Sequence, residues 1–209
     1  MNNLPYIRSG ELVCIICEGS EEYDYLNRIK ELGVWDRGYR VDLVNANGNG
    51  NLTARYQDKY QNGLYDVVLI FCDTDRKPFE QYKDIKRKIN EFHGKNNVAN
   101  LVVMFGNPCT MQVIIQHWGE AVLKSPSKSS NVSIIEELTG IEKYDAHLEQ
   151  RARMMKMINV ENYSLMLKRV SQMPSDDEIV GSSNFNIFMD YFSKDDHKWI
   201  DTINNVIEM

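Results

Sequence analysis

The chain has 209 residues, enough for one sizeable hydrophobic core with a smaller appended part, and 43% of them are apolar. Seven Phe, eleven Tyr and three Trp exclude an intrinsically disordered chain. No apolar stretch reaches the roughly 18 residues of a membrane span. The net charge is −6, whereas free-standing nucleic-acid binders usually carry a basic excess. Contact with nucleic acid would therefore need a local basic surface or a partner that supplies one.

The first residues and the cysteines predict a reducing, cytoplasmic setting. Residues 1–10 are polar and lack the apolar core of a signal peptide. Cys14 and Cys17 form a CxxC pair but lie within the apolar run Leu12–Cys17, where strand positions three apart face opposite sides. We therefore expect buried free thiols rather than a zinc or redox pair.

Strand and helix patterns alternate over the first 118 residues. Ser20 is expected to cap the first helix, and the loop Asn45–Asn51 is rich in turn formers. Such alternation implies right-handed crossovers and a parallel sheet flanked by helices, which is the α/β class. Strands are predicted at Leu12–Cys17, Tyr39–Val44, Tyr65–Cys72 and Val98–Phe105, and helices at Glu21–Leu32, Leu52–Gln61, Pro78–Phe92 and Thr110–Trp118.

The pattern changes after Trp118. A polar stretch, Lys124–Asn131, precedes a region of helical periodicity that is broken at Pro174–Ser183. We therefore predict an α/β domain over residues 1–120 and a helical C-terminal subdomain over residues 121–209. The helices of the second part are expected at Ser133–Leu138, Tyr144–Asn159, Val160–Gln172 and Asn184–Glu208.

Carboxylates follow two of the predicted strands, where each apolar run ends. Glu18 comes directly after the first strand, and Asp73 and Asp75 follow the strongest strand in the chain. In open α/β sheets, ligands bind outside the carboxyl ends of the strands, and neighbouring strands lie about 4.8 Å apart. Three carboxylates this close repel one another unless a cation joins them or some are protonated. Hard oxygen ligands suit Mg²⁺ or Mn²⁺, although acids after strands also serve as caps and turn formers.

These segments resemble the Toprim family, the metal-binding domain of topoisomerases, primases and OLD-type nucleases. Ile16–Leu26 (ICEGSEEYDYL) looks like its first motif, with Glu22 at an acidic position often seen in OLD-like members, and Leu69–Arg76 (LIFCDTDR) looks like its second. Phe105–Trp118 (FGNPCTMQVIIQHW) is similar to the NPCFE…LLHF stretch of RloB-like proteins. Those are small Toprim proteins often found beside an ATPase in prokaryotic defence loci. The resemblance covers roughly the first 120 residues.

The resemblance implies a chemistry in which acidic residues hold Mg²⁺ against a scissile phosphate. Asp73 and Asp75 would be metal ligands, and Glu18 would be a ligand or a general base. Met111 stands where RloB-like proteins usually carry a glutamate, a departure that bears on a second metal and on catalysis. The chain is too short for the separate DNA-gripping domain of a topoisomerase, so hydrolysis by activated water fits better than strand passage.

Four further residues near these motifs are candidates with open alternatives. Arg76 and Lys77 could contact phosphate or simply begin a solvated helix. Asn107 could line the site or make a structural turn. His117 could act as acid, base or ligand, but a lone histidine near the end of an apolar helix is more often a hydrogen-bonded partner within the core.

Two functions from different classes are consistent with these patterns. The first is a Mg²⁺-dependent (or Mn²⁺-dependent) nuclease that cleaves phosphodiester bonds in DNA or RNA, in prokaryotic anti-phage defence, with an ATPase partner. The second is a non-catalytic Toprim-like subunit that binds a partner ATPase or nucleic acid, which Met111 and the acidic net charge favour. The choice among DNA, RNA and tRNA, the number of metal ions and assembly as a homo-oligomer stay open.

Overall fold

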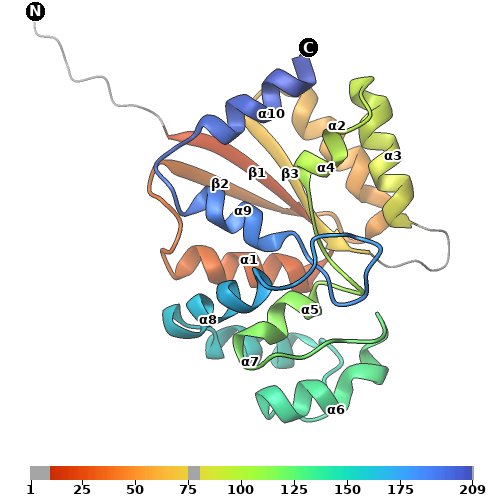
Figure 1. Ribbon diagram of the computed structural model, residues 1–209, viewed down its shortest axis with the longest axis vertical. Helices are drawn as coiled ribbons and strands as arrows, with labels where there is room; N and C mark the ends of the chain where they lie inside the picture. The colour runs from red at the N-terminus through yellow and green to blue at the C-terminus, as the bar shows by residue number, and fades with distance from the viewer. Residues whose placement is uncertain (1–9, 75–80, 209) are drawn as a thin grey trace, which may run out of the picture.

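Four apolar segments form an all-parallel sheet in the order β2-β1-β3-β4. The computed structural model describes residues 10–74 and 81–208, and Figure 1 shows the sheet with helices on both of its faces. The α/β class and the parallel sheet are therefore confirmed. The strands are β1 (Glu11–Cys17), β2 (Tyr39–Asn45), β3 (Val67–Asp73) and β4 (Val103–Gly106).

The burial of each strand follows its place in the sheet. β3 occupies a central position and is buried along nearly its whole length, as is the second half of β1. β2 lies at an edge, and its first residues alternate between buried and exposed. Continuous apolar runs are typical of strands covered on both faces, whereas alternation is typical of strands with one wet face.

Helices cover the two faces in unequal depth. On one face α1 packs on β1 and β2, and both α5 and α9 contact β4, while α7 packs against α1 and α8 packs against α9 as an outer layer. On the other face α2, α4 and α10 contact β3, and α3 packs against α2 and α4. The helices are α1 (Ser20–Glu31), η1 (Asn49–Asn51), α2 (Leu52–Gln61), α3 (Gln81–His93), α4 (Val98–Val102), α5 (Met111–Ile114), η2 (Ile115–His117), α6 (Lys128–Thr139), α7 (Leu148–Met157), α8 (Val160–Val170), α9 (Phe185–Phe192) and α10 (Lys198–Glu208).

The C-terminal segment returns to the sheet and covers the outer edge of β4. Ser183 Oγ donates to the Phe105 carbonyl at 2.6 Å, and Gly106 and Ser183 form an antiparallel bridge. The Asn184 side chain accepts from the Phe105 N–H at 2.9 Å and donates to the Val103 carbonyl at 2.8 Å. These bonds pair backbone groups that a free edge strand would leave open. The helical part after residue 120 is thus joined to the sheet by its last third.

Several sequence predictions need correction at this level. The first helix is capped by Gly19, and Ser20 is already its first residue. The segment Val98–Phe105 is a strand only in its second half, because Val98–Val102 forms α4. There the Ala99 N–H donates to Asn90 Oδ1 at 2.9 Å, and α4 packs between α3 and α10. A short apolar run can form either a buried strand or a buried helix, and its composition does not distinguish them.

The C-terminal region also differs from its predicted segmentation. Asn184–Glu208 is two helices, α9 and α10, separated by the turn 193–197. The polar stretch before α6 is shorter than expected, because that helix begins at Lys128. α7 begins only at Leu148. Among the described residues no helix is long and apolar enough to cross a membrane.

The cysteines lie in the interior as free thiols, as the strand pattern predicts. Cys14, Cys17, Cys72 and Cys109 are all buried and unpaired. Burial raises the pKa of the Cys14 thiol to about 12 and raises that of Cys17 well above its ordinary value. Such thiols stay protonated at neutral pH and are poor nucleophiles and poor metal ligands.

Candidate metal centre

The candidate site lies at the carboxyl edge of the sheet, between β1 and β3. The chain leaves β1 for β2 on one side and leaves β3 for β4 on the other, as the order β2-β1-β3-β4 requires. This reversal is the position where open α/β sheets bind ligands. Glu18 directly follows β1, and Asp73 is the last residue of β3.

A side-chain hydrogen bond joins these two acidic residues across the neighbouring strands. The Glu18 N–H donates to the Phe71 carbonyl at 3.0 Å, which extends the pairing of β1 with β3 by one residue. Glu18 Oε2 then accepts from the Asp73 backbone N–H at 2.9 Å. The structure thus brings Glu18 and Asp73 together, as their positions after adjacent parallel strands predict.

The loop after β4 adds a third element to this edge. Asp73 Oδ1 accepts from the Thr110 backbone N–H at 2.6 Å. The loop reaches Asp73 because it folds back closely over Gly106, where an added Cβ would lie 2.7 Å from the Cys109 carbonyl oxygen and 2.8 Å from Thr110 Cα. Only glycine permits this approach without a shift of the backbone.

Glu22, in the first turn of α1, completes the arrangement. The Thr110 hydroxyl contacts Glu22 Oε1 at 2.5 Å, and the Gly19 N–H donates to Glu22 Oε2 at 2.9 Å. Because Gly19 follows Glu18 directly in the chain, these hydrogen bonds form a closed ring of contacts. We call this set of Glu18, Gly19, Glu22, Asp73 and Thr110 the carboxylate ring.

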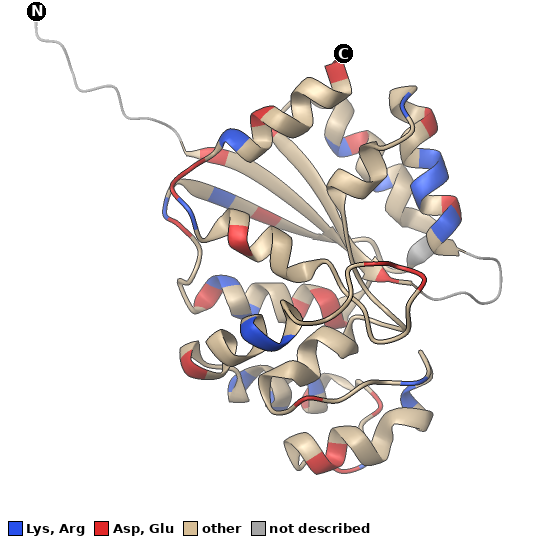
Figure 2. Ribbon diagram, in the orientation of Figure 1, with Lys and Arg blue, Asp and Glu red and all other residues tan. Residues whose placement is uncertain are grey.

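Burial and the charges of nearby acids raise the pKa values of Asp73 and Glu22. Burial is the largest cause for Asp73, followed by the charges of Glu18 and Glu22, and its pKa lies well above the ordinary value. Burial and the charge of Glu21 raise the pKa of Glu22, while the hydrogen bond with Thr110 opposes that rise. Figure 2 shows where the acidic and basic residues lie along the ribbon. Within residues 10–74 and 81–208, no Lys, Arg or His forms an ion pair with Glu22 or Asp73.

The oxygen atoms of the carboxylate ring fit a hard divalent cation. Asp73 Oδ2 accepts no hydrogen bond from another described residue, since Thr110 reaches only Oδ1. The neighbouring Thr74 hydroxyl is buried and lacks a hydrogen-bond partner in the described part of the chain. Mg²⁺ and Mn²⁺ bind through such oxygens and keep several waters. Both Glu22 oxygens are already hydrogen-bonded by the fold, so Glu22 is better suited to hold Thr110 in place than to bind metal.

The remaining candidates fall into three groups. Asp75, Arg76 and Lys77 lie outside the described residues, so the predicted trio of ligands stays a prediction. Asn107 is buried and is held by the 177–182 segment, since its amide donates to the Asp177 carbonyl at 2.7 Å and its N–H to the Ser182 carbonyl at 3.0 Å. These bonds give it a structural role in the turn after β4.

His117 is the third case and lies in the core. Its Nε2 is 3.1 Å from the Tyr25 hydroxyl, and its Nδ1 is 3.1 Å from Asn162 Oδ1. Burial lowers the pKa of His117 to about 4, so the ring is neutral at physiological pH. With both ring nitrogens engaged, His117 matches the alternative of a hydrogen-bonded core histidine.

Two residues of the site were not among the candidates predicted from the sequence. The sequence of the third motif does not distinguish Thr110 or Gly106 from their neighbours. In the structure, Thr110 bridges Asp73 to Glu22, and Gly106 lets the loop carrying Thr110 come close enough to do so. The signal that could have indicated them is their place after the fourth strand, at the same edge as the acids. The loop after β2 also meets this edge, because the Gly48 N–H donates to the Glu18 carbonyl at 2.8 Å.

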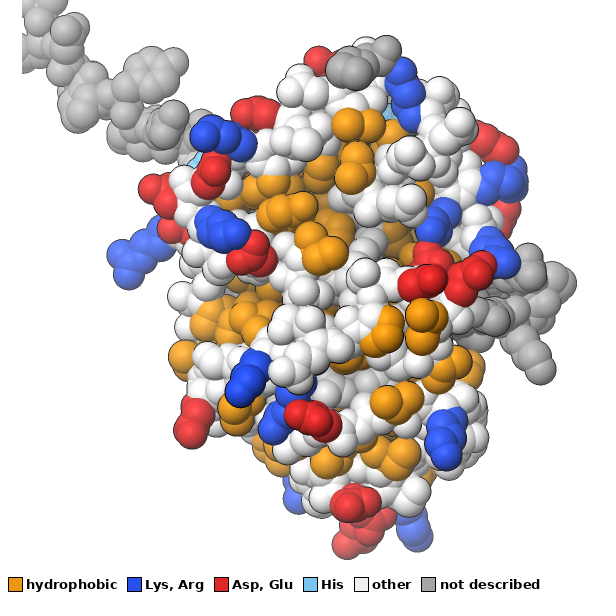
Figure 3. All heavy atoms as spheres, in the orientation of Figure 1, with side chains coloured by type: hydrophobic (Ala, Val, Ile, Leu, Met, Phe, Trp, Pro, Cys, Tyr) orange, Lys and Arg blue, Asp and Glu red, His pale blue; other side chains and the backbone are white. Residues whose placement is uncertain are grey.

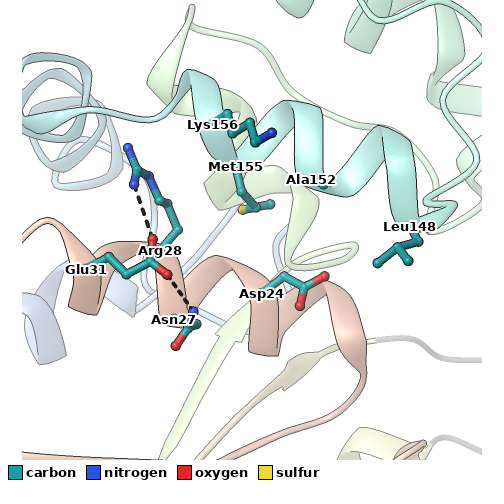
Figure 4. Close-up of a pocket in the computed structure, with 8 residues that line it drawn as sticks. All are labelled: Asp24, Asn27, Arg28, Glu31, Leu148, Ala152, Met155 and Lys156. Atoms are coloured by element: carbon teal, nitrogen blue, oxygen red, sulfur yellow. Dashed lines mark hydrogen bonds and ion pairs between the residues drawn. The ribbon is translucent and has the colours of Figure 1, made fainter.

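Two hollows lie away from the carboxylate ring. A cavity of about 280 Å³ opens between α1 and α7, and Figure 4 shows Arg28 and Asn27 bonded to Glu31 on one of its walls. A groove of about 230 Å³ runs between α4, α9 and α10, in the region where Figure 3 shows hydrophobic side chains gathered. Neither includes an acid of the ring.

Comparison with family models, with curated proteins and with solved structures finds no match to this chain.

Proposed function

We propose that the chain is a divalent-metal-dependent nuclease that hydrolyses phosphodiester bonds in nucleic acid. One observation carries the proposal. The carboxylate ring lies at the strand-order reversal, and two of its acids, Asp73 and Glu22, form no ion pair with a basic side chain among the described residues. A bound Mg²⁺ or Mn²⁺ would offset the burial and the neighbouring negative charges that raise the pKa of Asp73.

The residues divide into ligands and positioning groups. Asp73 and Glu18 would hold the metal, with Asp75 as a further ligand by the Toprim resemblance. When bound, the ion would stabilise charge on the scissile phosphate and activate a water molecule. The backbone N–H groups of Asp73 and Thr110 fix one oxygen of Glu18 and one of Asp73. Such outer contacts orient metal ligands and are worth roughly 10-fold to 100-fold in affinity or activity.

The nucleic-acid substrate and a role in prokaryotic defence rest on the resemblance to RloB-like proteins. The helix α3 follows the second motif. Its basic residues are the nearest ones along the described chain that could contact a phosphate backbone. Lys86 pairs with Asp177, and Arg87 pairs with Asp84 and Glu91. These basic groups are largely neutralised by their neighbours. A partner, such as the ATPase that accompanies RloB-like proteins, would supply part of the basic surface.

Cleavage assays with a charge-neutralising variant test this proposal. The protein is incubated with DNA, RNA and tRNA in Mg²⁺ or Mn²⁺, and Asp73→Asn is compared with Asp201→Asn, which removes the same charge from an exposed position on α10. We expect Asp73→Asn to lose cleavage by on the order of 100-fold or more, and Asp201→Asn to match the wild type. Equal cleavage by wild type and Asp73→Asn would remove the assignment.

A second function is favoured by one specific observation. Met111 takes the place of the glutamate in RloB-like proteins, and it is 3% exposed at the start of α5. A buried methionine adds no charge to the site, which supports a non-catalytic Toprim-like subunit that binds a partner or nucleic acid. That function predicts unchanged partner binding when Asp73 and Asp75 are both changed to Asn. Loss of the complex in that variant, restored by neither salt nor higher concentration, would count against it.

A further inference from the structure

A second cluster of metal-binding side chains lies at the opposite, amino edge of the sheet. Asp36 belongs to the loop between α1 and β2, while Asp195 and His197 belong to the turn between α9 and α10. Figure 1 shows these two connections beside each other, near the start of β2. Strands of seven residues separate the two edges by roughly 20 Å. This cluster is therefore independent of the carboxylate ring and of the nuclease proposal.

The three side chains already converge. One ligand atom from each of Asp36, Asp195 and His197 lies within 4.8 Å of the other two. Asp36 and His197 are half-buried, and Asp195 is exposed. Zinc ligands bind at roughly 2.0–2.2 Å, which places their atoms within about 4 Å of one another. The three atoms therefore lie close to the spacing that a zinc ion requires.

His197 provides a second observation that points to a ligand. Its Nε2 is shielded from solvent and has no hydrogen-bond partner among the described residues. Buried polar atoms without a partner are rare and require an explanation such as an ion. An added Cβ at Gly38 would lie 2.7 Å from His197 Nε2 and 2.9 Å from Asp36 Oδ1, so both atoms pack against Gly38 and lie close to each other.

The other ring nitrogen of His197 faces a carboxylate. Glu11 Oε1 lies 3.6 Å from His197 Nδ1. Histidines that bind metal usually direct their second ring nitrogen to a carboxylate, which fixes the tautomer and raises the basicity of the coordinating nitrogen. Glu11 is placed to do this, because it is the first residue of β1 and pairs with Tyr39 at the start of β2.

Hydrogen bonds around the cluster hold the Asp36 side chain and join the two connections that carry the ligands. The Asp36 N–H donates to the Phe192 carbonyl at 2.8 Å, which joins the loop before β2 to the end of α9. Asp36 Oδ1 accepts from the Gly38 N–H at 2.7 Å. The Tyr39 hydroxyl donates to the Asp196 carbonyl at 3.4 Å and accepts from Trp199 Nε1 at 2.8 Å.

We propose that Asp36, Asp195 and His197 form a zinc site that fastens the α9–α10 turn to the loop before β2. Imidazole together with carboxylates suits Zn²⁺ better than Mg²⁺, which prefers oxygen ligands alone. With three protein ligands, a water molecule completes the tetrahedron. The ion joins two segments about 160 residues apart and so stabilises the attachment of the C-terminal helices to the sheet.

Titration of the full chain with Zn²⁺ alone, after chelator treatment, tests the site. We expect one equivalent to bind in calorimetry and the melting temperature to rise by about 3–5 °C at tenfold excess over the dissociation constant. His197→Ala and Asp195→Asn should each lose affinity at least tenfold. His147→Ala, which changes a histidine whose side chain is 78% exposed, should bind like the wild type.

Each contrary result overturns the proposal. Wild-type protein without saturable Zn²⁺ binding excludes the site, and so does a loss of less than tenfold in Asp195→Asn. Because Asp195 is exposed, that variant tests the ligand even if His197→Ala folds poorly. Asp73→Asn should bind Zn²⁺ like the wild type, and a matching tenfold loss there would place the ion in the carboxylate ring instead.

Discussion

Asp73 at the end of β3 and Asp84 on α3 are the same type of residue in opposite surroundings. Burial, Glu18 and Glu22 raise the pKa of Asp73 well above its ordinary value. Hydrogen bonds from Lys88 and Arg87 lower the pKa of Asp84, whose side chain is 39% exposed. Asp84 is balanced by basic groups of its own helix, whereas Asp73 forms no ion pair among the described residues.

The two regions therefore use their acids differently. Ion pairs one turn apart on an exposed helix contribute little to stability, because water and salt screen them. A charged carboxylate that is buried among neutral N–H and hydroxyl groups destabilises the fold. A bound cation would remove this destabilisation, which favours its binding. The contrast between buried and exposed groups can be tested at three positions.

The largest expected effect on stability comes from a buried histidine, His117. His117 has a pKa lowered from 6.5 to about 4 by burial, so the unfolded chain binds its proton first as the pH falls. The stability of the fold should therefore decrease between pH 6.5 and pH 4, by about 3 kcal/mol from this group.

Urea unfolding of the wild type and of His117→Gln at pH 7 and pH 4 measures this contribution as the difference between their pH dependences. His147→Gln is the control, because that histidine is exposed. If His117→Gln and the wild type lose the same stability on acidification, His117 does not carry the effect.

The next prediction tests whether the carboxylate ring depends on the close packing at Gly106. In Gly106→Ala the new methyl would meet the Cys109 carbonyl oxygen at 2.7 Å, so the loop carrying Thr110 must shift away from Asp73. We expect a loss of about 2 kcal/mol in the free energy of unfolding, as for other overpacked positions. Gly50→Ala, where nothing lies within 4 Å of the added Cβ, should change stability far less, and equal losses would contradict this account.

The smallest effect lies on the exposed side of the comparison. Asp84→Asn removes the partner of Arg87 and Lys88 on α3. Because these groups are exposed, the free energy of unfolding should fall by less than about 0.5 kcal/mol, and the difference should vanish in high salt. A loss above 1 kcal/mol that persists in 1 M salt would mean that the surface network is stronger than its exposure implies.

Much of the sheet could be predicted, since its strands are unusually apolar and its turns carry clear breaks. The runs at Leu12–Cys17 and Tyr65–Cys72 are strands that pair with each other, and Leu52–Gln61 is the helix α2. The closeness of Glu18 to Asp73 followed from the geometry of parallel strands. These features depend on local periodicity, which a sequence displays directly.

The rest depends on contacts between distant parts of the chain. Thr110 and Glu22 are 88 residues apart, and no local pattern shows that the loop after β4 turns back over Gly106. The apolar residues of Val98–Val102 fit a buried strand as well as the helix that they form. Packing against α3 and α10 favours the helix over a strand, and these long-range contacts cannot be seen in a single sequence.

The covering of β4 by Ser183 and Asn184 has a consequence for the newly made chain. Ser183 lies 78 residues after Phe105, its partner on β4. At the usual rate of 5–20 residues per second, that segment takes roughly 4 to 16 s to synthesise. During this interval an emerging sheet would carry an open edge, ready to pair with another chain. We therefore expect the yield of soluble protein to depend on how quickly the last third of the chain reaches that edge.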